Sequence, residues 1–454
     1  MISLQDKKIG IWGFGLVGKS ALYYTTKEGA KCSIFDQREL NKDEQDSIKQ
    51  QHGTIEKTLE LFLHSNDYIL PSPGVDISSY KQKHSFICEL DLFASKWRKP
   101  SIAITGSVGK TTVTTLISKL LAKRLSVITA GNIGTPMLYT IERQDEADIA
   151  VMELSSWQLE YSSYYAPEIA IITNLYPNHL DRHKTMENYL LAKAHICRYQ
   201  NEDQTLIAPL QLQQQLQYLS IRSNCIWISL TRPKTHFFKL CSNILFLDTK
   251  RVIYWHNKTE KMIIEINTLS RSIMIENWLF ALATLLQMQL PMELTDECSL
   301  QIEHRIEKVT TIDKLTFYND SKATTTEATL AALEQFKNEK IILFLGGLSK
   351  GVDRSTLIAQ LPNNVISIVC FGKEADQLKE YCANANRSAQ SFCNLEKAFI
   401  YAIENKKDAT IALLSPSGSS YDLYTNYEER GEHFKRLITG AITPPRKQLD
   451  SLNI

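Results

Sequence analysis

The most informative segment for chemistry is a short run rich in glycine, lysine and threonine. Residues 105–112 read Thr-Gly-Ser-Val-Gly-Lys-Thr-Thr and follow an apolar stretch that ends at Ile104. In phosphate-binding loops, backbone N–H groups cradle phosphates, the lysine reaches the terminal phosphates and the hydroxyl binds Mg²⁺. Ile104 stands where the usual pattern has its first glycine. We therefore predict a nucleotide-binding loop here, with a ligand-free surface turn as the alternative.

A second glycine-rich run lies near the N-terminus. Gly13, Gly15 and Gly18 follow an apolar stretch, and Asp36 ends the next one. Glycines let the backbone approach a pyrophosphate, and the first turn of the following helix adds positive potential. The pattern predicts a nucleotide-like ligand, for which NAD is the simplest candidate. A tight turn with no ligand is the alternative.

Polar residues recur directly after other apolar runs. Glu153 and His179 are candidate ligands for Mg²⁺, which prefers oxygen, keeps several waters and shares substrate phosphates. Taken alone, Glu153 also suits a solvated strand end and His179 a capped loop. Toward the C-terminus, cationic and hydroxyl groups that suit carboxylates or phosphates cluster in residues 304–305, 319–324, 346–351 and 415–422.

The sequence around these residues predicts an α/β fold. Short apolar runs alternate with helix-like patterns along most of the chain, which predicts parallel sheets with helices between the strands. Open sheets of this type bind ligands beyond the carboxyl ends of their strands, which is where the polar segments lie. Domain boundaries are predicted near 96 and near 300. Strands are expected at residues 8–12, 31–35, 101–105, 148–152, 168–172, 315–318, 341–345, 365–370 and 410–414.

The composition narrows the class of protein. The chain has 454 residues, 43% hydrophobic and 22% charged, so several domains with ordinary cores are expected. Lys and Arg total 51 against 50 Asp and Glu, and this net charge of +1 argues against a general nucleic-acid binder. No apolar run reaches the ~18 residues of a membrane span, and no signal peptide is recognisable. Nine scattered cysteines without a C-x-x-C pair indicate a reducing cytoplasm.

Taken in order, these motifs resemble the Mur ligase family over nearly the whole chain. The most specific segments are residues 109–112, 178–182 with 187–189 and 192–193, 319–324, and 419–422 with 426–431. The resemblance implies three α/β domains: a Rossmann-like UDP-substrate domain (1–96), a P-loop ATPase domain (97–300) and a Rossmann-like amino-acid-binding domain (301–454). In that family the first glycine loop grips the pyrophosphate of UDP.

The resemblance also implies an activity. It is closest to family members that add D-glutamate to UDP-N-acetylmuramoyl-L-alanine, using ATP and an acyl-phosphate intermediate, in peptidoglycan precursor synthesis. The implied enzyme is a cytoplasmic monomer that binds two Mg²⁺ ions and small-molecule substrates, without a nucleic-acid partner or a membrane span.

The family motifs assign roles to individual residues. ATP contacts fall on Gly106, Ser107, Val108, Gly109, Lys110, Thr111, Thr112, Arg305 and Asp320. Contacts to the UDP substrate fall on Gly15, Leu16, Val17, Asp36, Arg38, Gly74, Asn132 and Gln158. D-glutamate contacts fall on Thr324, Lys350, Ser420 and Tyr427. The catalytic set is Lys110, Glu153, His179 and Lys193, and the metal ligands are Thr111, Glu153, His179 and Lys193.

Lys193 maps onto a lysine that the family carries as a carbamate. A bare ammonium beside a divalent cation would be repelled, whereas a carbamate offers an anionic oxygen that suits Mg²⁺. By spacing alone, a helix lysine that points into solvent is the simpler interpretation.

Several positions depart from the family pattern. Asn178 stands where Asp is usual, Glu303 where Pro is usual, and Ile273 with Met274 where a His-Asn pair is usual. The first change predicts weaker Mg²⁺ binding, and the last leaves an adenine contact without its usual residues.

The alternative functions are another Mur or folylpolyglutamate-type ligase, an NAD-dependent dehydrogenase, and a non-catalytic nucleotide-binding module.

Overall fold

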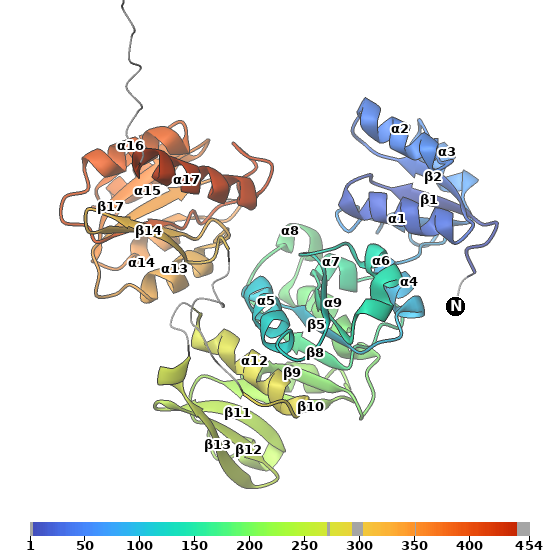
Figure 1. Ribbon diagram of the computed structural model, residues 1–454, viewed down its shortest axis with the longest axis horizontal. Helices are drawn as coiled ribbons and strands as arrows, with labels where there is room; N and C mark the ends of the chain where they lie inside the picture. The colour runs from blue at the N-terminus through green and yellow to red at the C-terminus, as the bar shows by residue number, and fades with distance from the viewer. Residues whose placement is uncertain (1–2, 270–272, 293–302, 350, 443–454) are drawn as a thin grey trace, which may run out of the picture. The chain divides into compact units, whose positions relative to one another are not determined.

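The computed structural model describes residues 3–269, 273–292, 303–349 and 351–442 of the chain. It confirms the predicted α/β class, because parallel strands joined by helices form three sheets. By their contacts the described residues fall into two compact units, one up to residue 292 and the other from residue 303. The first unit holds the first two sheets and the second unit holds the third (Figure 1).

The first sheet is parallel, with strand order β3-β2-β1-β4. Its central strand β1 is buried along four of its five residues, and the glycine-rich turn follows it directly. The strands are β1 (Lys8–Trp12), β2 (Lys31–Phe35), β3 (Thr54–Ile55) and β4 (Tyr68–Pro71). The helices are α1 (Leu16–Lys27), α2 (Lys42–Gln50), α3 (Leu59–Ser65) and α4 (Glu89–Lys96).

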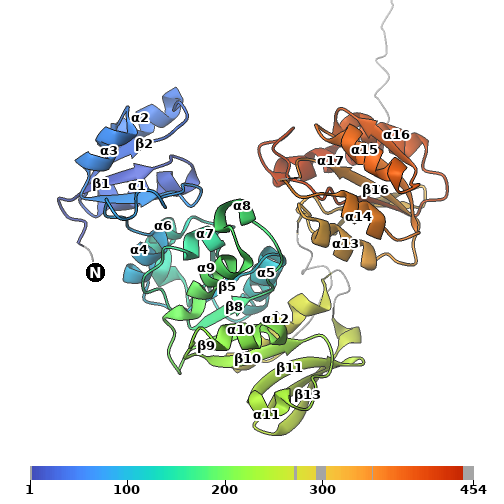
Figure 2. The same ribbon diagram turned by 180° about the vertical axis from the view of Figure 1, so that it is seen from behind.

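The second sheet has nine strands in the order β13-β12-β11-β10-β9-β8-β5-β7-β6. Strand β5 lies between β7 and β8, so the loops after these three parallel strands meet at one edge. The strands are β5 (Ser101–Thr105), β6 (Val127–Gly131), β7 (Ile149–Glu153), β8 (Ile169–Ile172), β9 (Thr205–Pro209), β10 (Asn224–Ser229), β11 (Asn243–Asp248), β12 (Arg251–His256) and β13 (Thr259–Glu265). Figure 2 shows β11 and β13 at the end of the sheet away from β5.

Helices of the central region pack on this sheet, with α5 beside α12. Helix α5 buries the apolar residues Val113, Leu116, Ile117, Leu120 and Leu121, a spacing that places them on one helical face. The helices are α5 (Lys110–Leu121), α6 (Met137–Thr140), α7 (Ser156–Leu159), α8 (Leu180–His183), α9 (Met186–Arg198), α10 (Gln213–Gln217), α11 (Phe237–Leu240) and α12 (Ile275–Gln287).

The third sheet has the order β14-β15-β19-β16-β17-β18, and only β14 among its described strands runs antiparallel to its neighbour. Two hydrophobic cores cover its two faces, with α13 and α14 on one side and α16 and α17 on the other (Figure 1). The strands are β14 (Glu307–Ile312), β15 (Leu315–Asn319), β16 (Ile341–Gly346), β17 (Val365–Phe371), β18 (Ala389–Phe392) and β19 (Ile411–Leu414). The helices are α13 (Thr326–Glu334), α14 (Ser355–Gln360), α15 (Ala375–Asn384), α16 (Leu395–Glu404) and α17 (Tyr427–Ile442).

Candidate active site

The phosphate loop between β5 and α5 needs its two glycines. Gly106 has φ +145° and Gly109 has φ +86°, conformations that residues with a Cβ rarely adopt. A Cβ on Gly106 would also overlap the side chain of Thr173 at the end of β8. The strand–loop–helix context that the sequence predicted is therefore present, with the backbone shaped as an anion cradle demands.

Asn174, just beyond β8, braces the same loop. Its Oδ1 accepts a hydrogen bond from the Val108 N–H at 2.8 Å, and its Nδ2 donates to the Val108 carbonyl at 3.0 Å. The Ser107 hydroxyl donates to the Tyr176 carbonyl at 3.0 Å. Sequence analysis missed this role of Asn174, although the residue is a polar side chain directly after an apolar strand.

A hydroxyl and a carboxylate that were predicted as metal ligands meet beside the loop. Thr111 Oγ1 donates to Glu153 Oε2 at 2.7 Å, and both side chains are buried. No three His, Cys, Asp or Glu side chains of the described residues form a group able to hold a metal. A hard cation here would therefore share this oxygen pair with water and substrate phosphates, which is the coordination that Mg²⁺ favours.

Lys193 on α9 lies under the loop and away from solvent. Its side chain is 1% exposed, and its Nζ donates to the Gly106 carbonyl at 2.9 Å. Lys110 Nζ donates to the same carbonyl at 2.9 Å. Burial, and next the nearby Lys110 charge, hold the pKa of Lys193 well below its usual range. The lysine is therefore buried beside the phosphate loop, contrary to the solvent-facing interpretation.

His179 is the residue directly before α8 and has a left-handed backbone, at φ +54°. Its ring packs edge-on against Trp157 with the ring centroids 5.2 Å apart. The Asn178 side chain accepts a hydrogen bond from the His179 N–H at 3.0 Å. The structure thus assigns Asn178 a local role at the start of the helix that carries the predicted metal ligand.

The glycine loop of the first sheet is held by Asp36. Its Oδ2 accepts from the Phe14 N–H at 2.7 Å, and its Oδ1 accepts from the Arg38 N–H at 3.0 Å. The Arg38 guanidinium forms two hydrogen bonds of 2.8 Å with Glu44. Of the other residues predicted to bind the UDP substrate, Gly15 and Leu16 are exposed, and a Cβ on Gly74 would meet nothing within 4 Å. Val17 is half-buried in the first turn of α1.

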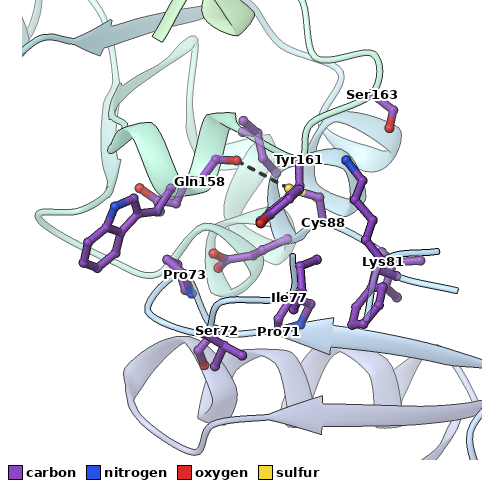
Figure 3. Close-up of a pocket in the computed structure, with 15 residues that line it drawn as sticks. Pro71, Ser72, Pro73, Ile77, Lys81, Cys88, Gln158, Tyr161 and Ser163 are labelled. Carbon is purple, nitrogen blue, oxygen red and sulfur yellow. Dashed lines mark hydrogen bonds between the residues drawn. The ribbon is translucent and has the colours of Figure 1, made fainter. Parts of the chain in front are cut away.

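A cavity of about 230 Å³ adjoins this loop region (Figure 3). It is enclosed by Ser72 and Pro73 after β4 and, from the other side, by Gln158 and Tyr161. The Ser72 hydroxyl donates to the Gly13 carbonyl at 3.0 Å, which links the cavity wall to the glycine loop.

The predicted substrate residue Gln158 has a structural partner inside this wall. Its Oε1 accepts from the Ser155 N–H at 2.9 Å and closes a capping box at the start of α7. The Cys88 thiol donates to the Gln158 carbonyl at 3.5 Å. Asn132 is exposed beyond β6, where its N–H donates to the Glu153 carbonyl at 2.9 Å.

Glu89, the first residue of α4, also lines the cavity and was not predicted as a site residue. Its side chain is 4% exposed, and both carboxyl oxygens lack a hydrogen-bond partner. Burial raises the pKa of this carboxyl to about 8. No local sequence signal distinguishes it from an ordinary acidic residue in the first turn of a helix.

In the second unit, the predicted ATP contacts Arg305 and Asp320 influence one another. Asp320 is 1% exposed and accepts hydrogen bonds from Ser415 Oγ at 2.8 Å and from the Ile306 N–H at 3.2 Å. Burial raises the pKa of Asp320 to about 6, and the Arg305 charge opposes that shift. Arg305 is half-buried.

The predicted D-glutamate residues lie on loops at the carboxyl edge of the third sheet. Ser420 is buried, whereas Thr324 and Tyr427 are half-buried. Lys322 Nζ donates to the Tyr427 hydroxyl at 2.7 Å, which joins two of these loops. Lys350 lies outside the residues that the structure describes.

Comparison with known proteins identifies the family. Residues 104–285 match the Mur ligase middle domain, and residues 304–418 match the Mur ligase glutamate ligase domain. A UDP-N-acetylmuramoylalanine–D-glutamate ligase of Fervidobacterium nodosum is 31% identical over 442 residues, covering 94% of this chain and 97% of the relative. The chain belongs to the Mur ligase family.

A second relative supports the Mur ligase assignment, and solved structures share the fold. A second UDP-N-acetylmuramoylalanine–D-glutamate ligase, from Leuconostoc mesenteroides, is 31% identical and covers 95% of this chain and 96% of its own length. The fold is similar to that of a MurF ligase from Thermotoga maritima in complex with ADP, at a TM-score of 0.57 and 14% identity, covering 96% of each chain. A pseudomurein peptide ligase type C from Methanothermus fervidus gives 0.56 and 17%, covering 96% of this chain and 100% of the other.

One polar contact to the Mur ligase phosphate loop was not predicted. A Cβ on Gly109 would lie 2.8 Å from Asn277 Oδ1, so the amide of Asn277 on α12 lies against the loop. Nearby, Ile273 is buried and Met274 precedes the helix. An asparagine in the first turn of a mainly apolar helix is the sequence signal for this contact.

Proposed function

We propose that this Mur ligase joins D-glutamate to UDP-N-acetylmuramoyl-L-alanine in an ATP-dependent amide synthesis that builds peptidoglycan precursors. The observation that carries the proposal is the phosphate loop with Lys110, Thr111 and Glu153, in a chain that aligns over most of its length with D-glutamate ligases. Its ligands are all small molecules, and we place the enzyme in the cytoplasm as a monomer. A helix of the length and apolarity needed to cross a membrane is absent from the described residues.

The reaction requires two anions to approach one another. The alanyl carboxylate attacks the γ-phosphorus of ATP, so that ADP leaves and an acyl phosphate forms. The amine of D-glutamate then attacks the acyl carbon, loses a proton, and inorganic phosphate leaves. Lys110 offsets the repulsion between the carboxylate and the γ-phosphate, and loop N–H groups hold the phosphates.

Thr111 and Glu153 are the residues that would hold Mg²⁺, and their hydroxyl and carboxylate oxygens fit its preference for hard ligands. When bound, the ion would add positive charge at the phosphates. His179 is proposed as a ligand for a second ion. Domain closure is proposed to bring Arg305 and Asp320 to the nucleotide.

We infer that Lys193 acts as a carbamate. Burial and the nearby Lys110 charge lower the pKa of its amine, which favours the neutral form that adds to CO₂. The Lys193→Ala variant should lose turnover by about 10² or more, and a small carboxylic acid such as propionate should restore part of it. A ¹³C-bicarbonate-labelled wild type should show a carbamate carbon signal that the variant lacks. Full activity of the variant would contradict the inference.

The remaining site residues are assigned to the two other substrates, the UDP substrate in the first compact unit and D-glutamate in the second. The loop of Gly15 to Val17, with Asp36, Arg38 and Gly74, is proposed to bind the UDP moiety, and Asn132 and Gln158 its sugar-peptide end. Thr324, Ser420 and Tyr427, with Lys350, are proposed to bind D-glutamate.

An assay of phosphate release tests which amino acid the enzyme uses. The enzyme is assayed with ATP, UDP-N-acetylmuramoyl-L-alanine and a panel of D-glutamate, L-glutamate, L-lysine and D-alanine. Turnover with D-glutamate alone is expected. Turnover only with another amino acid would instead favour another Mur or folylpolyglutamate-type ligase. NAD binding without ATP binding would favour the dehydrogenase, and binding without any turnover the non-catalytic module.

A further inference from the structure

The cavity of about 230 Å³ in the first compact unit contains a buried acid that the proposed reaction does not use. Glu89 lines this cavity and is 4% exposed, and neither of its carboxyl oxygens has a hydrogen-bond partner in the part of the chain that the structure describes. A polar group that is buried without a partner costs free energy, which a suitable partner recovers. A ligand that bonds to Glu89 would therefore gain affinity from this cost.

Several other polar groups of the cavity wall are bonded within the chain. The Ser72 hydroxyl donates to the Gly13 carbonyl at 3.0 Å, and the Cys88 thiol donates to the Gln158 carbonyl at 3.5 Å. Among the described residues of this wall, the buried side-chain atoms without a partner are the two Glu89 oxygens and Nε1 of Trp157. Glu89 is therefore the main polar group that the wall offers to a ligand.

The Glu89 carboxyl is mainly protonated at neutral pH. Burial raises its pKa to about 8, and no neighbouring charge among the described residues contributes to that shift. In the protonated form one oxygen carries an O–H donor and the other oxygen accepts. The acid thus presents a hydrogen-bond donor and an acceptor side by side.

Charged residues near the cavity act on other groups of its wall. Asp91 influences Cys88, and Glu160 and Arg182 influence Tyr161. Burial raises the pKa of both Cys88 and Tyr161 to about 12, so neither group changes charge between pH 6 and pH 9. Of the three titratable groups with a raised pKa in this wall, Glu89 is the one whose charge changes in that range.

The space beside the acid suits a small organic molecule. One water needs ~10–15 Å³ of comparable volume, so a cavity of about 230 Å³ is far larger than a water site. Much of its lining is apolar, including the buried residues Ile77 and Leu90. The exposed residues Lys81 and Ser163 also line it and lie toward one side of it in Figure 3, so the cavity reaches the surface.

We propose that this cavity binds a small primary carboxamide with an apolar body, and that the Glu89 carboxyl anchors it. A primary carboxamide has an N–H and a C=O on the same side, which matches the O–H and C=O of a protonated carboxyl. The Glu89 O–H would donate to the amide oxygen, and the amide N–H would donate to the second Glu89 oxygen. Both unpartnered oxygens would then be satisfied, while the apolar body would lie against the apolar wall.

The observations favour this ligand over two others. An amidinium or ammonium ligand would require the acid to ionise in a largely apolar wall, which carries a desolvation cost. Of the residues assigned above to the UDP substrate, Gln158 alone is among the described residues that line the cavity. The carboxamide site is therefore separate from the proposed reaction and does not rest on the proposed function.

An NMR titration of the full ¹⁵N-labelled chain with benzamide tests the proposal. Saturable shifts are expected for the backbone amides of Leu90 and Ser163, which line the cavity. Methyl benzoate has nearly the same shape without an N–H, and it should bind at least about fivefold more weakly at pH 6. At pH 9 about one tenth of Glu89 is still protonated, so the affinity of the wild type for benzamide should fall about tenfold.

Two variants separate the hydrogen-bonding group from the space around it. E89Q also presents a donor beside an acceptor but does not titrate, so it should bind benzamide at pH 6 and at pH 9 within about threefold of the wild-type affinity at pH 6. E89L fills the position with an apolar side chain and should bind benzamide and methyl benzoate equally weakly. An equal pH dependence in E89Q and the wild type, or a preference for benzamide in E89L, would overturn the assignment of Glu89.

Three further outcomes would also overturn the proposal. These are the absence of saturable shifts with benzamide, tighter binding of benzamidine than of benzamide at pH 7, and displacement of benzamide by UDP-N-acetylmuramoyl-L-alanine. The second would show an ionised carboxylate, and the third would assign the cavity to the UDP substrate. If E89L fails to fold by circular dichroism, the comparison of E89Q with the wild type still decides. Benzamide binding needs no turnover, so failure of the D-glutamate assay would refute the proposed function and leave this site standing.

Discussion

The first compact unit uses a glycine-rich turn between a parallel strand and a helix twice, and the two turns differ in their surroundings. Beside the Gly106–Gly109 turn lie two lysines, a threonine hydroxyl and the Glu153 carboxylate. Beside the Gly13–Gly18 turn, Asp36 ties down the backbone and Arg38 is paired with Glu44. Under the proposed function, the same backbone conformation would serve bond making in one place and substrate binding in the other. The two turns differ in the charged side chains around them and not in their glycines.

Removing the lysine of the reacting loop gives the largest expected effect. Lys110→Met should lower turnover by about 10²–10³, since one preorganised charge-stabilising group contributes ~3–4 kcal/mol to the barrier. Binding of UDP-N-acetylmuramoyl-L-alanine should stay unchanged, measured by isothermal titration beside a phosphate-release assay. A parallel loss of UDP-substrate binding would contradict the proposal that catalysis and UDP-substrate binding belong to different loops.

The glycines of the binding loop give the next effect, on stability. A Cβ on Gly18 would overlap the Gly13 carbonyl, whereas one on Gly15 would meet nothing within 4 Å. Gly18→Ala should therefore destabilise the first unit by about 2–3 kcal/mol, and Gly15→Ala, its matched control, by less than about 0.5 kcal/mol. Urea unfolding of both variants measures the difference. Equal effects would mean that close packing at Gly18 is not needed.

Glu89 tests the cavity behind the binding loop. Because burial raises its pKa to about 8 from an ordinary 4.5, the folded chain holds this proton more tightly than the unfolded chain. The stability that comes with the proton is complete below about pH 4.5 and is lost as pH rises toward 8. Glu89→Gln should match the wild type at pH 5 and exceed its stability by about 1–3 kcal/mol at pH 9.

Urea unfolding at pH 5, 7 and 9 measures this trend. Glu39→Gln, an exposed change in the same unit, should leave the pH profile of the wild type as it is. A constant gap between the Glu89 variant and the wild type across this range would contradict the raised pKa.

The smallest effect concerns the metal side of the reacting loop. Asn178→Asp restores a negative charge next to His179 and should lower the Mg²⁺ concentration for half-maximal activity by about two- to fivefold. The variant removes an amide that already accepts the His179 N–H, and an aspartate oxygen can accept the same bond. An unchanged Mg²⁺ requirement would show that residue 178 does not influence Mg²⁺ binding.

Local spacing made both loops and most strands predictable. The phosphate loop needs only eight consecutive residues, and β5, β7 and β8 follow from apolar runs that the structure places within one residue of expectation. Lys193 shows the limit, because which face of α9 packs against the phosphate loop depends on contacts 87 residues apart. Asn174 and Asn277 were missed for the same reason. Each is an ordinary polar residue until the fold sets it against a distant loop.

The Gly106 carbonyl accepts hydrogen bonds from both Lys110 and Lys193. If Lys193 carries the proposed carbamate, the activity of the enzyme depends on dissolved CO₂. The amine and its carbamate exchange with dissolved CO₂, so the competent fraction of enzyme rises and falls with the CO₂ tension around it. A preparation stripped of CO₂ should start slowly and accelerate when bicarbonate is added. The rate of the proposed ligation would then depend on the CO₂ concentration as well as on the concentrations of the substrates.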